Sequence, residues 1–278
     1  MPIDYREDWL TGREEDPENQ SCEFRNKLDL GPAPPSKQNT IVAVAGRKGS
    51  GKSTVTREIL LHCDRLFLFD TMSEHSWIPD QFTDVAEAHY YIFERGHSKD
   101  PFRGSFICED AGKGALERSF VEICNAVYET GNMTLAVEEL PMLSQPNYVP
   151  EEFDRIIRTG RHHCINVLYT GQRLSECPRR VTAATDIFVL FHHSEPRDLD
   201  AIAERCGPEV AEMVAQLGDF EFLVYSVKLR STVIVDNEWY NSVLIPDSEW
   251  TPAYGGKHGR HTLWSLNDGD TTRNTRRT

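Results

Sequence analysis

Residues 41–53 read IVAVAGRKGSGKS, an apolar run followed by a glycine-rich turn that ends in Lys-Ser. From Gly46 to Ser53 the letters fit the pattern GxxxxGK[ST]. Glycines let such a turn fold with several backbone N–H groups aimed at one phosphate, and a helix that begins there adds the positive end of its dipole. The stretch therefore predicts a phosphate-binding loop (P-loop) between a buried strand and a helix.

The residue types in this loop suit a nucleoside triphosphate. Lys52 supplies a mobile positive charge for the β- and γ-phosphates, and the Ser53 hydroxyl is a ligand for Mg²⁺. The predicted cofactors are therefore ATP and Mg²⁺. The predicted nucleotide-binding residues are Gly46, Arg47, Lys48, Gly49, Ser50, Gly51, Lys52, Ser53 and Thr54.

Strand and helix signals alternate on both sides of this loop. Apolar runs predict strands at Ile41–Ala45, Leu66–Phe69, Ser105–Cys108, Met133–Val137, Ile165–Thr170 and Ile187–Phe191, with a closing hairpin from Phe220–Tyr225 and Thr232–Val235. Helical spacing predicts helices at Gly51–Cys63, Ala86–Arg95, Ala115–Thr130, Glu151–Arg161, Arg197–Arg205 and Val210–Leu217. The alternation predicts an α/β domain with a mainly parallel sheet and helices on both faces.

Composition divides the chain into three segments. Residues 1–40 form an acidic arm, with nine acids and four bases within 1–30, and residues 251–278 form a basic tail. Both ends are predicted to be flexible, since they are poor in core residues. The ATPase domain is predicted to span residues 41–250.

Charge and apolar content exclude several classes of protein. The 278 residues carry 30 Lys and Arg against 44 Asp and Glu, so nucleic acid would be contacted only through a local basic patch. No apolar run reaches the roughly 18 residues of a membrane span, and no signal peptide is visible. Seven scattered cysteines without a CxxC motif predict reduced thiols. A soluble cytoplasmic protein without an integral membrane segment is expected.

Two adjacent acids, Glu138 and Glu139, follow the strand Met133–Val137. In P-loop enzymes the first acid at this point lies near Mg²⁺, and a second acid can polarise the attacking water as a general base. We predict that Glu138 joins Ser53 at the metal and that Glu139 is the general base. The alternative is an acidic strand end that only faces solvent.

The strand Ile165–Thr170 leads into Gly171 and Gln172. An amide at the end of a strand beside the P-loop strand can sense the γ-phosphate or hold the attacking water. We therefore place Gln172 among the catalytic residues, the alternative being an ordinary turn residue.

These stretches, taken in order, resemble one family. They read GRKGSGKST (46–54), LFLFD (66–70), TLAVEEL (134–140), RTGRHHCINVLYTGQR (158–173) and CPRRVTAATDIFVLFHHSEPRDLDAI (177–202). Over about residues 41–226 the chain resembles the HerA/FtsK superfamily of P-loop ATPases. Its short single-domain form is similar to the genome-packaging ATPases of membrane-containing tailless viruses and related phage or prophage proteins.

The resemblance implies an ASCE-type, RecA-like core and a hexameric ring that moves double-stranded DNA with ATP. It implies a capsid or portal-vertex partner, and a location in the host cytoplasm or with the virion. Two positions depart from the family pattern: Glu138 stands where Asp is usual, and Gly171 precedes Gln172 where a small or apolar residue is more usual.

Arginines gather in residues 155–180, which hold six of them against the single acid Glu176. A ring motor needs a cation from the neighbouring subunit to stabilise charge on the transferring γ-phosphate. Family position favours Arg179 or Arg180 for this role, with Arg158 and Arg161 as candidates at the subunit boundary. The alternative is ordinary ion pairing with the acids Glu151, Glu152 and Asp154.

Three other functions stay open on the sequence. A P-loop kinase would transfer phosphate to a small acceptor, although the paired glutamates and Gln172 weigh against it. A nucleotide-gated switch or adaptor would bind ATP with little turnover, which Glu138 in place of Asp would suit. A cellular HerA-type ATPase would process DNA outside a virus.

Overall fold

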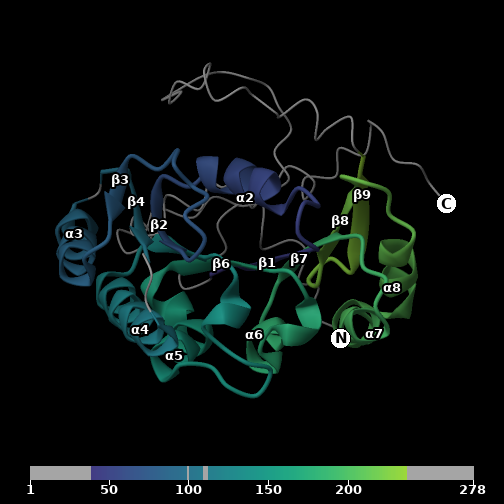
Figure 1. Ribbon diagram of the computed structural model, residues 1–278. Helices are drawn as coiled ribbons and strands as arrows, with labels where there is room; N and C mark the ends of the chain where they lie inside the picture. Colours follow the sequence, from purple (N-terminus) through teal and green to yellow (C-terminus); the bar gives the residue numbers. More distant parts are fainter. Residues whose placement is uncertain (1–38, 99, 109–111, 237–278) are drawn as a thin grey trace, which may run out of the picture.

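The computed structural model describes residues 39–98, 100–108 and 112–236 (Figure 1). The predicted basic tail, residues 237–250 of the predicted domain and nearly all of the predicted acidic arm lie outside these residues. Within the described part, no helix combines the length and apolar character that a membrane span requires.

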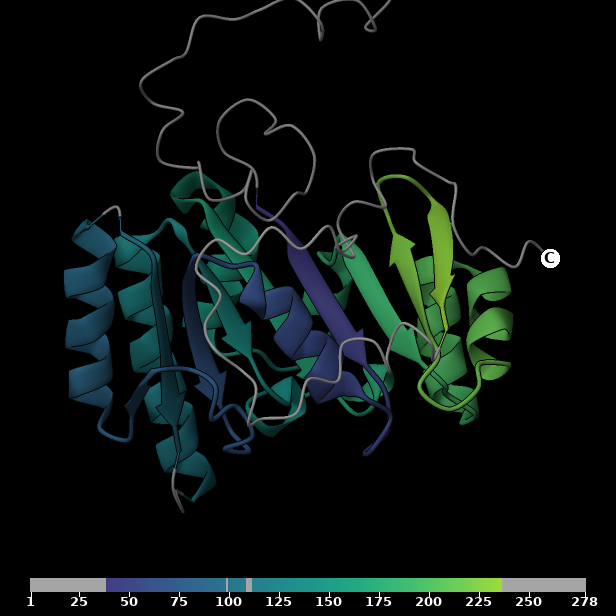
Figure 2. The same ribbon diagram turned by 90° about the horizontal axis from the view of Figure 1, so that it is seen from above.

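The described residues form a nine-stranded sheet with the order β3-β4-β2-β5-β6-β1-β7-β8-β9. Neighbours from β3 to β7 are parallel, whereas β8 and β9 add an antiparallel hairpin at one edge. The carboxyl ends of the parallel strands meet at one edge of the sheet (Figure 2). The strands are β1 (Ile41–Ala45), β2 (Arg65–Asp70), β3 (Asp80–Phe82), β4 (Phe102–Ile107), β5 (Met133–Val137), β6 (Ile165–Gly171), β7 (Ile187–Phe191), β8 (Phe222–Ser226) and β9 (Ser231–Val235).

The helices cover the two faces of the sheet unequally (Figure 1). Among the described helices, only α2 packs its apolar side chains on one face, and the others build the larger core on the opposite face. The helices are α2 (Lys52–Leu61), α3 (Val85–His97), α4 (Lys113–Thr130), α5 (Glu151–Thr159), α6 (Arg179–Ala183), α7 (Pro196–Cys206) and α8 (Pro208–Ala215). The predicted mainly parallel sheet with helices on both faces is confirmed.

Side chains that alternate between the two faces of β1 explain why the sheet has one core on each face. In β1, Ala43 and Ala45 belong to the larger core, whereas Val42 and Val44 face α2 and contact the smaller core. Successive side chains of a strand point to opposite faces, so a strand covered on both sides is apolar throughout. All five residues of β1 are accordingly buried.

Aromatic rings connect the helices and strands of the larger core to one another. The Phe120 ring of α4 lies 5.0 Å from the Phe69 ring of β2 and 5.2 Å from the Phe153 ring of α5, centroid to centroid. Phe69 also packs on Phe106 of β4 at 5.4 Å. Because all four side chains are buried, this cluster fixes α4 and α5 against the sheet.

The predicted strands and helices are all present, several with shifted ends, whereas strand β3, helix α6 and the 3-10 turns Leu140–Met142 and Leu174–Glu176 were not predicted. Strand β3 has a single apolar residue, Phe82, and is held by ring packing of Phe82 on Tyr91 and by a 2.6 Å hydrogen bond from the Tyr91 hydroxyl to Asp80. Helix α6 is only one turn long, which is too short for a periodic pattern to indicate it.

The prediction of reduced thiols is correct for five cysteines of the described part, which form no disulfide, and wrong for Cys164, which is disulfide-bonded. The prediction rested on the scattered spacing and odd number of the cysteines, and neither excludes a bond between cysteines far apart in the sequence.

We expect Phe120→Ala to lower the free energy of unfolding by about 3–5 kcal/mol, because it empties a fully buried site between β2 and α5. Phe93→Ala on α3 is the matched control, since that ring is 49% exposed and its loss should change stability by less than about 0.5 kcal/mol. Urea unfolding followed by circular dichroism measures both. Similar losses in the two variants would contradict the assigned core.

Candidate functional site

The P-loop connects the end of β1 to the start of α2 at the carboxyl edge of the sheet. Gly49 and Gly51 have φ angles of 78° and 105°, in the left-handed region that favours glycine. A Cβ on Gly46 would lie 2.6 Å from the Cβ of Phe191, so the loop leaves β1 in close contact with β7. The loop therefore needs glycine for backbone shape at two positions and for space at a third.

Lys52 folds back over this loop. Its Nζ donates a hydrogen bond to the Arg47 carbonyl oxygen at 3.2 Å. Burial lowers the pKa of the Lys52 ammonium, while the charges of Glu139, Glu74 and Glu138 act in the opposite direction. The structure thus brings the predicted lysine together with both predicted acids and with Glu74.

Glu74 was not identified from the sequence, although it contacts the predicted metal ligand directly. The Ser53 hydroxyl donates a hydrogen bond to Glu74 Oε2 at 2.7 Å. Glu74 follows β2, whose carboxyl end lies at the same edge of the sheet as the P-loop. Its position shortly after a buried strand was the available signal, but the polar sequence around it has no pattern.

A buried polar cluster lies beside Glu138. Asp70, at the end of β2, accepts hydrogen bonds from the backbone N–H groups of Met72, Glu74 and His75 at 3.1 to 3.3 Å. His75 Nε2 lies 3.1 Å from Glu138 Oε2. The sequence analysis missed His75, because only the fold brings it to the acidic strand end.

The hydrogen bond from Trp77 fixes which ring nitrogen of His75 carries the proton. The Trp77 indole N–H, which can only donate, bonds to His75 Nδ1 at 3.1 Å, so the imidazole proton lies on Nε2 and faces Glu138. Burial raises the pKa of Glu138 to about 7, with His75 opposing the shift and Asp70 adding to it. A cation at this site would replace the lost hydration of the carboxylate.

The oxygens around Ser53 fit Mg²⁺. Glu138 Oε2 is buried and faces His75 Nε2 at 3.1 Å, which leaves this oxygen a second lone pair for a metal. Mg²⁺ takes one or two carboxylates together with phosphates and water, and it needs no cage made only of protein. The described residues accordingly contain no cluster of three or more His, Cys, Asp or Glu side chains that could form such a cage.

Glu139 and Gln172 are also brought together. The Glu139 backbone N–H donates to Thr170 Oγ1 at 2.9 Å, and its Oε1 accepts from the Gln172 backbone N–H at 3.1 Å. Glu139 has φ 48° and ψ 59°, a left-handed conformation that costs a non-glycine residue on the order of 1–3 kcal/mol. These contacts to β6 hold the carboxylate in place, and the Gln172 side chain is exposed beside it.

Gly171 lies close to the Cys177 side chain. A Cβ at Gly171 would lie 3.0 Å from Cys177 Sγ, which is tighter than ordinary contact, and 3.5 Å from Pro141 Cδ, which is ordinary contact. A larger residue at this position would therefore need the Cys177 side chain to shift slightly.

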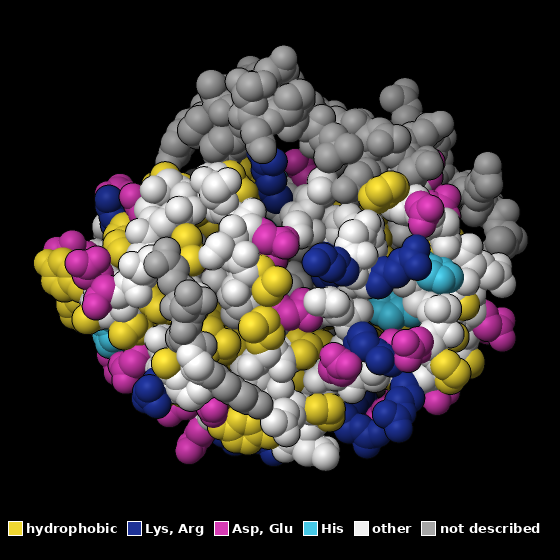
Figure 3. Space-filling view, viewed as in Figure 1, with side chains coloured by type: hydrophobic (Ala, Val, Ile, Leu, Met, Phe, Trp, Pro, Cys, Tyr) yellow, Lys and Arg dark blue, Asp and Glu magenta, His cyan; other side chains and the backbone are white. Residues whose placement is uncertain are grey.

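The arginines make ion pairs away from the P-loop. Arg158 and Arg180 both contact Asp154 Oδ2, at 2.9 and 2.7 Å, so ordinary ion pairing applies to this pair. Arg179 is 73% exposed and its nearest carboxylate contact, with Glu204, is 3.9 Å long. Basic and acidic side chains are interleaved beside α6 and α7 (Figure 3).

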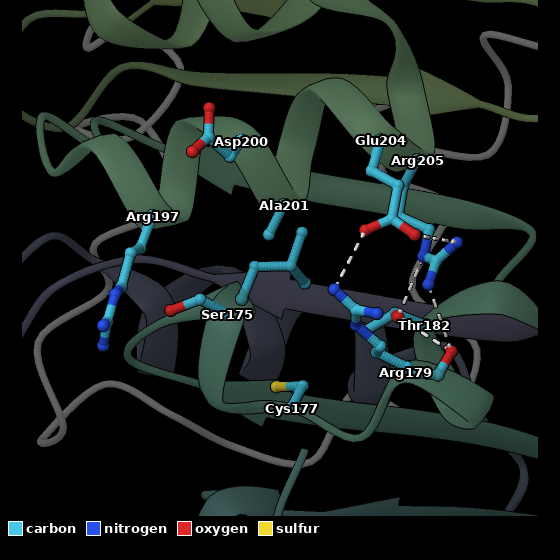
Figure 4. Close-up of a pocket in the computed structure, with 10 residues that line it drawn as sticks. Ser175, Cys177, Arg179, Thr182, Arg197, Asp200, Ala201, Glu204 and Arg205 are labelled. Carbon is cyan, nitrogen blue, oxygen red and sulfur yellow. Dashed lines mark hydrogen bonds and ion pairs between the residues drawn. The ribbon is translucent and has the colours of Figure 1, made fainter. Parts of the chain in front are cut away.

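A cavity of about 280 Å³ lies between α6 and α7 (Figure 4). Arg205 spans one end of it, donating to Thr182 Oγ1 at 3.1 Å and to the Arg179 carbonyl oxygen at 3.4 Å. The Arg179 side chain points towards Glu204 across this end. In the described residues, Arg179 and Arg180 thus make their ion pairs with α7 and α5, not with the P-loop.

Comparison with known proteins identifies the fold. No protein-family profile and no curated protein matches the chain, whereas solved structures do. The genome packaging NTPase B204 from Sulfolobus turreted icosahedral virus 2, in complex with ATP-γS, has a TM-score of 0.59 at 20% identity, over 71% of this chain and 97% of that chain.

Two further structures agree. B204, the DNA-packaging ATPase from Sulfolobus turreted icosahedral virus, matches with a TM-score of 0.56 at 21% identity, over 72% of this chain and 98% of that chain. VirB4 of Thermoanaerobacter pseudethanolicus matches with a TM-score of 0.56 at 10% identity, over 75% and 91%. The chain has the α/β, RecA-like fold of these ATPases, as the resemblance in its sequence implied.

Beside the P-loop, His193 follows β7 and is buried, with Nδ1 2.8 Å from the Phe191 carbonyl oxygen. Burial lowers the pKa of His193 below its ordinary 6.5, although the hydrogen bond to Phe191 acts in the opposite direction. Below pH 6.5 the unfolded chain then binds the proton that the folded chain resists.

We therefore expect His193 to reduce stability as the pH drops through about 6.5, so that the free energy of unfolding of the wild type falls relative to that of His193→Asn over this range. Asparagine keeps a donor near the Phe191 carbonyl but does not titrate. Urea unfolding of both proteins between pH 5 and 8 gives the two slopes. Parallel slopes would show that His193 does not contribute.

Proposed function

We propose that this protein is an ATPase that moves double-stranded DNA as a homo-hexameric ring and packages a viral genome. The observation that carries the proposal is the position of Glu139. Its carboxylate is tied to the Gln172 N–H at the end of the strand next to β1, and its charge acts on Lys52. The fold shared with packaging and VirB4-type ATPases supports a translocase.

The residues of the site at the carboxyl edge are assigned different roles in ATP hydrolysis. The backbone of the P-loop and Lys52 would hold the β- and γ-phosphates, while Ser53 and Glu138 would hold Mg²⁺. The metal supplies positive charge to the phosphate oxygens. Glu139 takes a proton from the water that attacks the γ-phosphorus, the bond to the β–γ bridging oxygen breaks, and ADP leaves with that oxygen.

Gln172 is proposed to position the attacking water. Gln172 is exposed, its backbone N–H bonds to the Glu139 carboxylate, and Glu139 is itself held by Thr170 of β6. Paired glutamates followed by this amide favour transfer to water over transfer to a small acceptor, which argues against a kinase.

The cation from the neighbouring subunit is assigned to Arg179. Arg180 shares Asp154 with Arg158, whereas Arg179 is more exposed and its ion pair among the described residues is the long contact to Glu204. An exposed arginine with a weak intrachain contact can reach a phosphate in the next subunit at little cost. DNA would contact basic side chains inside the ring, and a capsid or portal-vertex protein would anchor the ring in the host cytoplasm or virion.

A nucleotide-gated switch with little turnover is the second candidate. It is favoured by Glu138, whose raised pKa and contact with His75 reduce the negative charge offered to a metal near neutral pH.

We expect the steady-state Mg²⁺-ATPase rate to rise on addition of long double-stranded DNA. Glu139→Gln should lower kcat by about 10²-fold or more, because it removes the general base. Glu129→Gln, an exposed acid on α4, is the matched control and should leave the rate unchanged. Tight ATP binding without turnover would select the switch, and a strictly monomeric protein with nucleotide and DNA present would exclude the ring.

We expect Arg179→Ala and Lys52→Ala each to abolish turnover alone, and mixtures of the two to regain part of it. In a mixed ring, an intact P-loop can meet an intact Arg179 from its neighbour. Nucleotide binding by Arg179→Ala should match wild type, as measured by calorimetry. A mixture as inactive as its components would contradict the assignment in trans.

A further inference from the structure

The segment between β2 and β3 brings a third carboxylate to the P-loop. Glu74 Oε2 lies 2.7 Å from Ser53 Oγ and accepts its hydrogen bond. Glu74 belongs neither to the P-loop nor to the acidic strand end, so neither motif accounts for it.

A built turn holds Glu74 in this position. The buried Asp70 carboxylate accepts the Glu74 backbone N–H at 3.3 Å and the His75 N–H at 3.1 Å. The Thr71 hydroxyl donates to the Glu138 carbonyl oxygen at 3.0 Å, which ties the same turn to β5. The Glu74 side chain is exposed, but its backbone is fixed to two neighbouring strands.

The hydrogen bond to Glu74 leaves the Ser53 oxygen free to bind a metal. A hydroxyl has one proton and two lone pairs, so a carboxylate that takes the proton leaves the lone pairs for a cation. The Ser53 Oγ to Glu74 Oε2 distance of 2.7 Å is that of an O–H···O hydrogen bond, so Glu74 acts on the hydroxyl and would not itself bind the ion.

We propose that Glu74 is a positioning residue of the Mg²⁺ site, which orients the Ser53 hydroxyl and adds negative charge beside the ion. This inference rests on the proposed function, because it requires a nucleotide–Mg²⁺ complex at the P-loop. Glu138 Oε2, which is buried and whose contact in the described residues is His75 Nε2 at 3.1 Å, marks the same site from the other strand.

A role of Glu74 at the metal can be distinguished from a purely structural role by comparing metal binding with nucleotide binding. Without metal, the Glu74 carboxylate lies near Lys52 and repels the phosphates of a nucleotide. With metal, the same carboxylate stabilises the bound cation. Removing its charge should therefore weaken metal binding without weakening nucleotide binding in the absence of metal.

The test uses the full chain with Mn²⁺ as the probe and a non-hydrolysable ATP analogue. Mn²⁺ affinity is measured by electron paramagnetic resonance with saturating analogue, and analogue affinity is measured by calorimetry in EDTA. Glu74→Gln should weaken Mn²⁺ binding by about 10- to 100-fold, the range for outer-shell partners of a metal site. Its analogue affinity in EDTA should be equal to wild type or tighter.

Glu74→Asp should retain part of the Mn²⁺ affinity, and Glu87→Gln, which removes an exposed charge at the start of α3, should retain all of it. Wild-type Mn²⁺ affinity in Glu74→Gln would overturn the inference, as would an equal loss of analogue affinity in EDTA. If the wild-type chain binds no analogue under either condition, the proposed function fails first and the inference with it.

Discussion

The parallel pairing of β1 with β6 is the contact on which the site depends. It runs in register from Ile41 opposite Val167 to Ala45 opposite Gly171, and the Gly46 N–H continues it to the Gly171 carbonyl oxygen at 3.2 Å. This register sets the P-loop beside the loop that follows β6. A slip of one residue would turn the side chains of a strand to the opposite faces and separate the two loops.

Stability and chemistry come from different parts of the same sheet. The large core, with its joined phenylalanine rings, lies on the face covered by most of the described helices and holds the strands in order. The polar groups gather at the carboxyl edge, where each parallel strand ends and backbone groups are free to bond side chains. The Asp70 carboxylate accepts the backbone N–H of Glu74, and the Thr170 hydroxyl accepts the backbone N–H of Glu139.

Motifs and apolar runs made much of this fold predictable, and the limits have physical causes. The P-loop and the strand ends at Glu138 and Gln172 are local patterns, so the sequence reveals them directly. Glu74 and His75 reach the site only through the turn built on Asp70, within a polar segment that has no periodicity. The ion pair of Asp154 with Arg158 lies within α5 at i,i+4 spacing and agrees with the ion pairing that the sequence offered as an alternative, whereas the pair of Asp154 with Arg180 required the packing of α6, which was not predicted.

The bond from Lys52 to the Arg47 carbonyl has a consequence for the turnover of any bound nucleotide. A phosphate must displace an internal partner when it arrives, and the same partner takes the ammonium back when the product departs. The lysine is then satisfied in both conditions, so product release exposes no unpaired buried cation. The phosphate-binding loop therefore carries an internal acceptor for its own lysine.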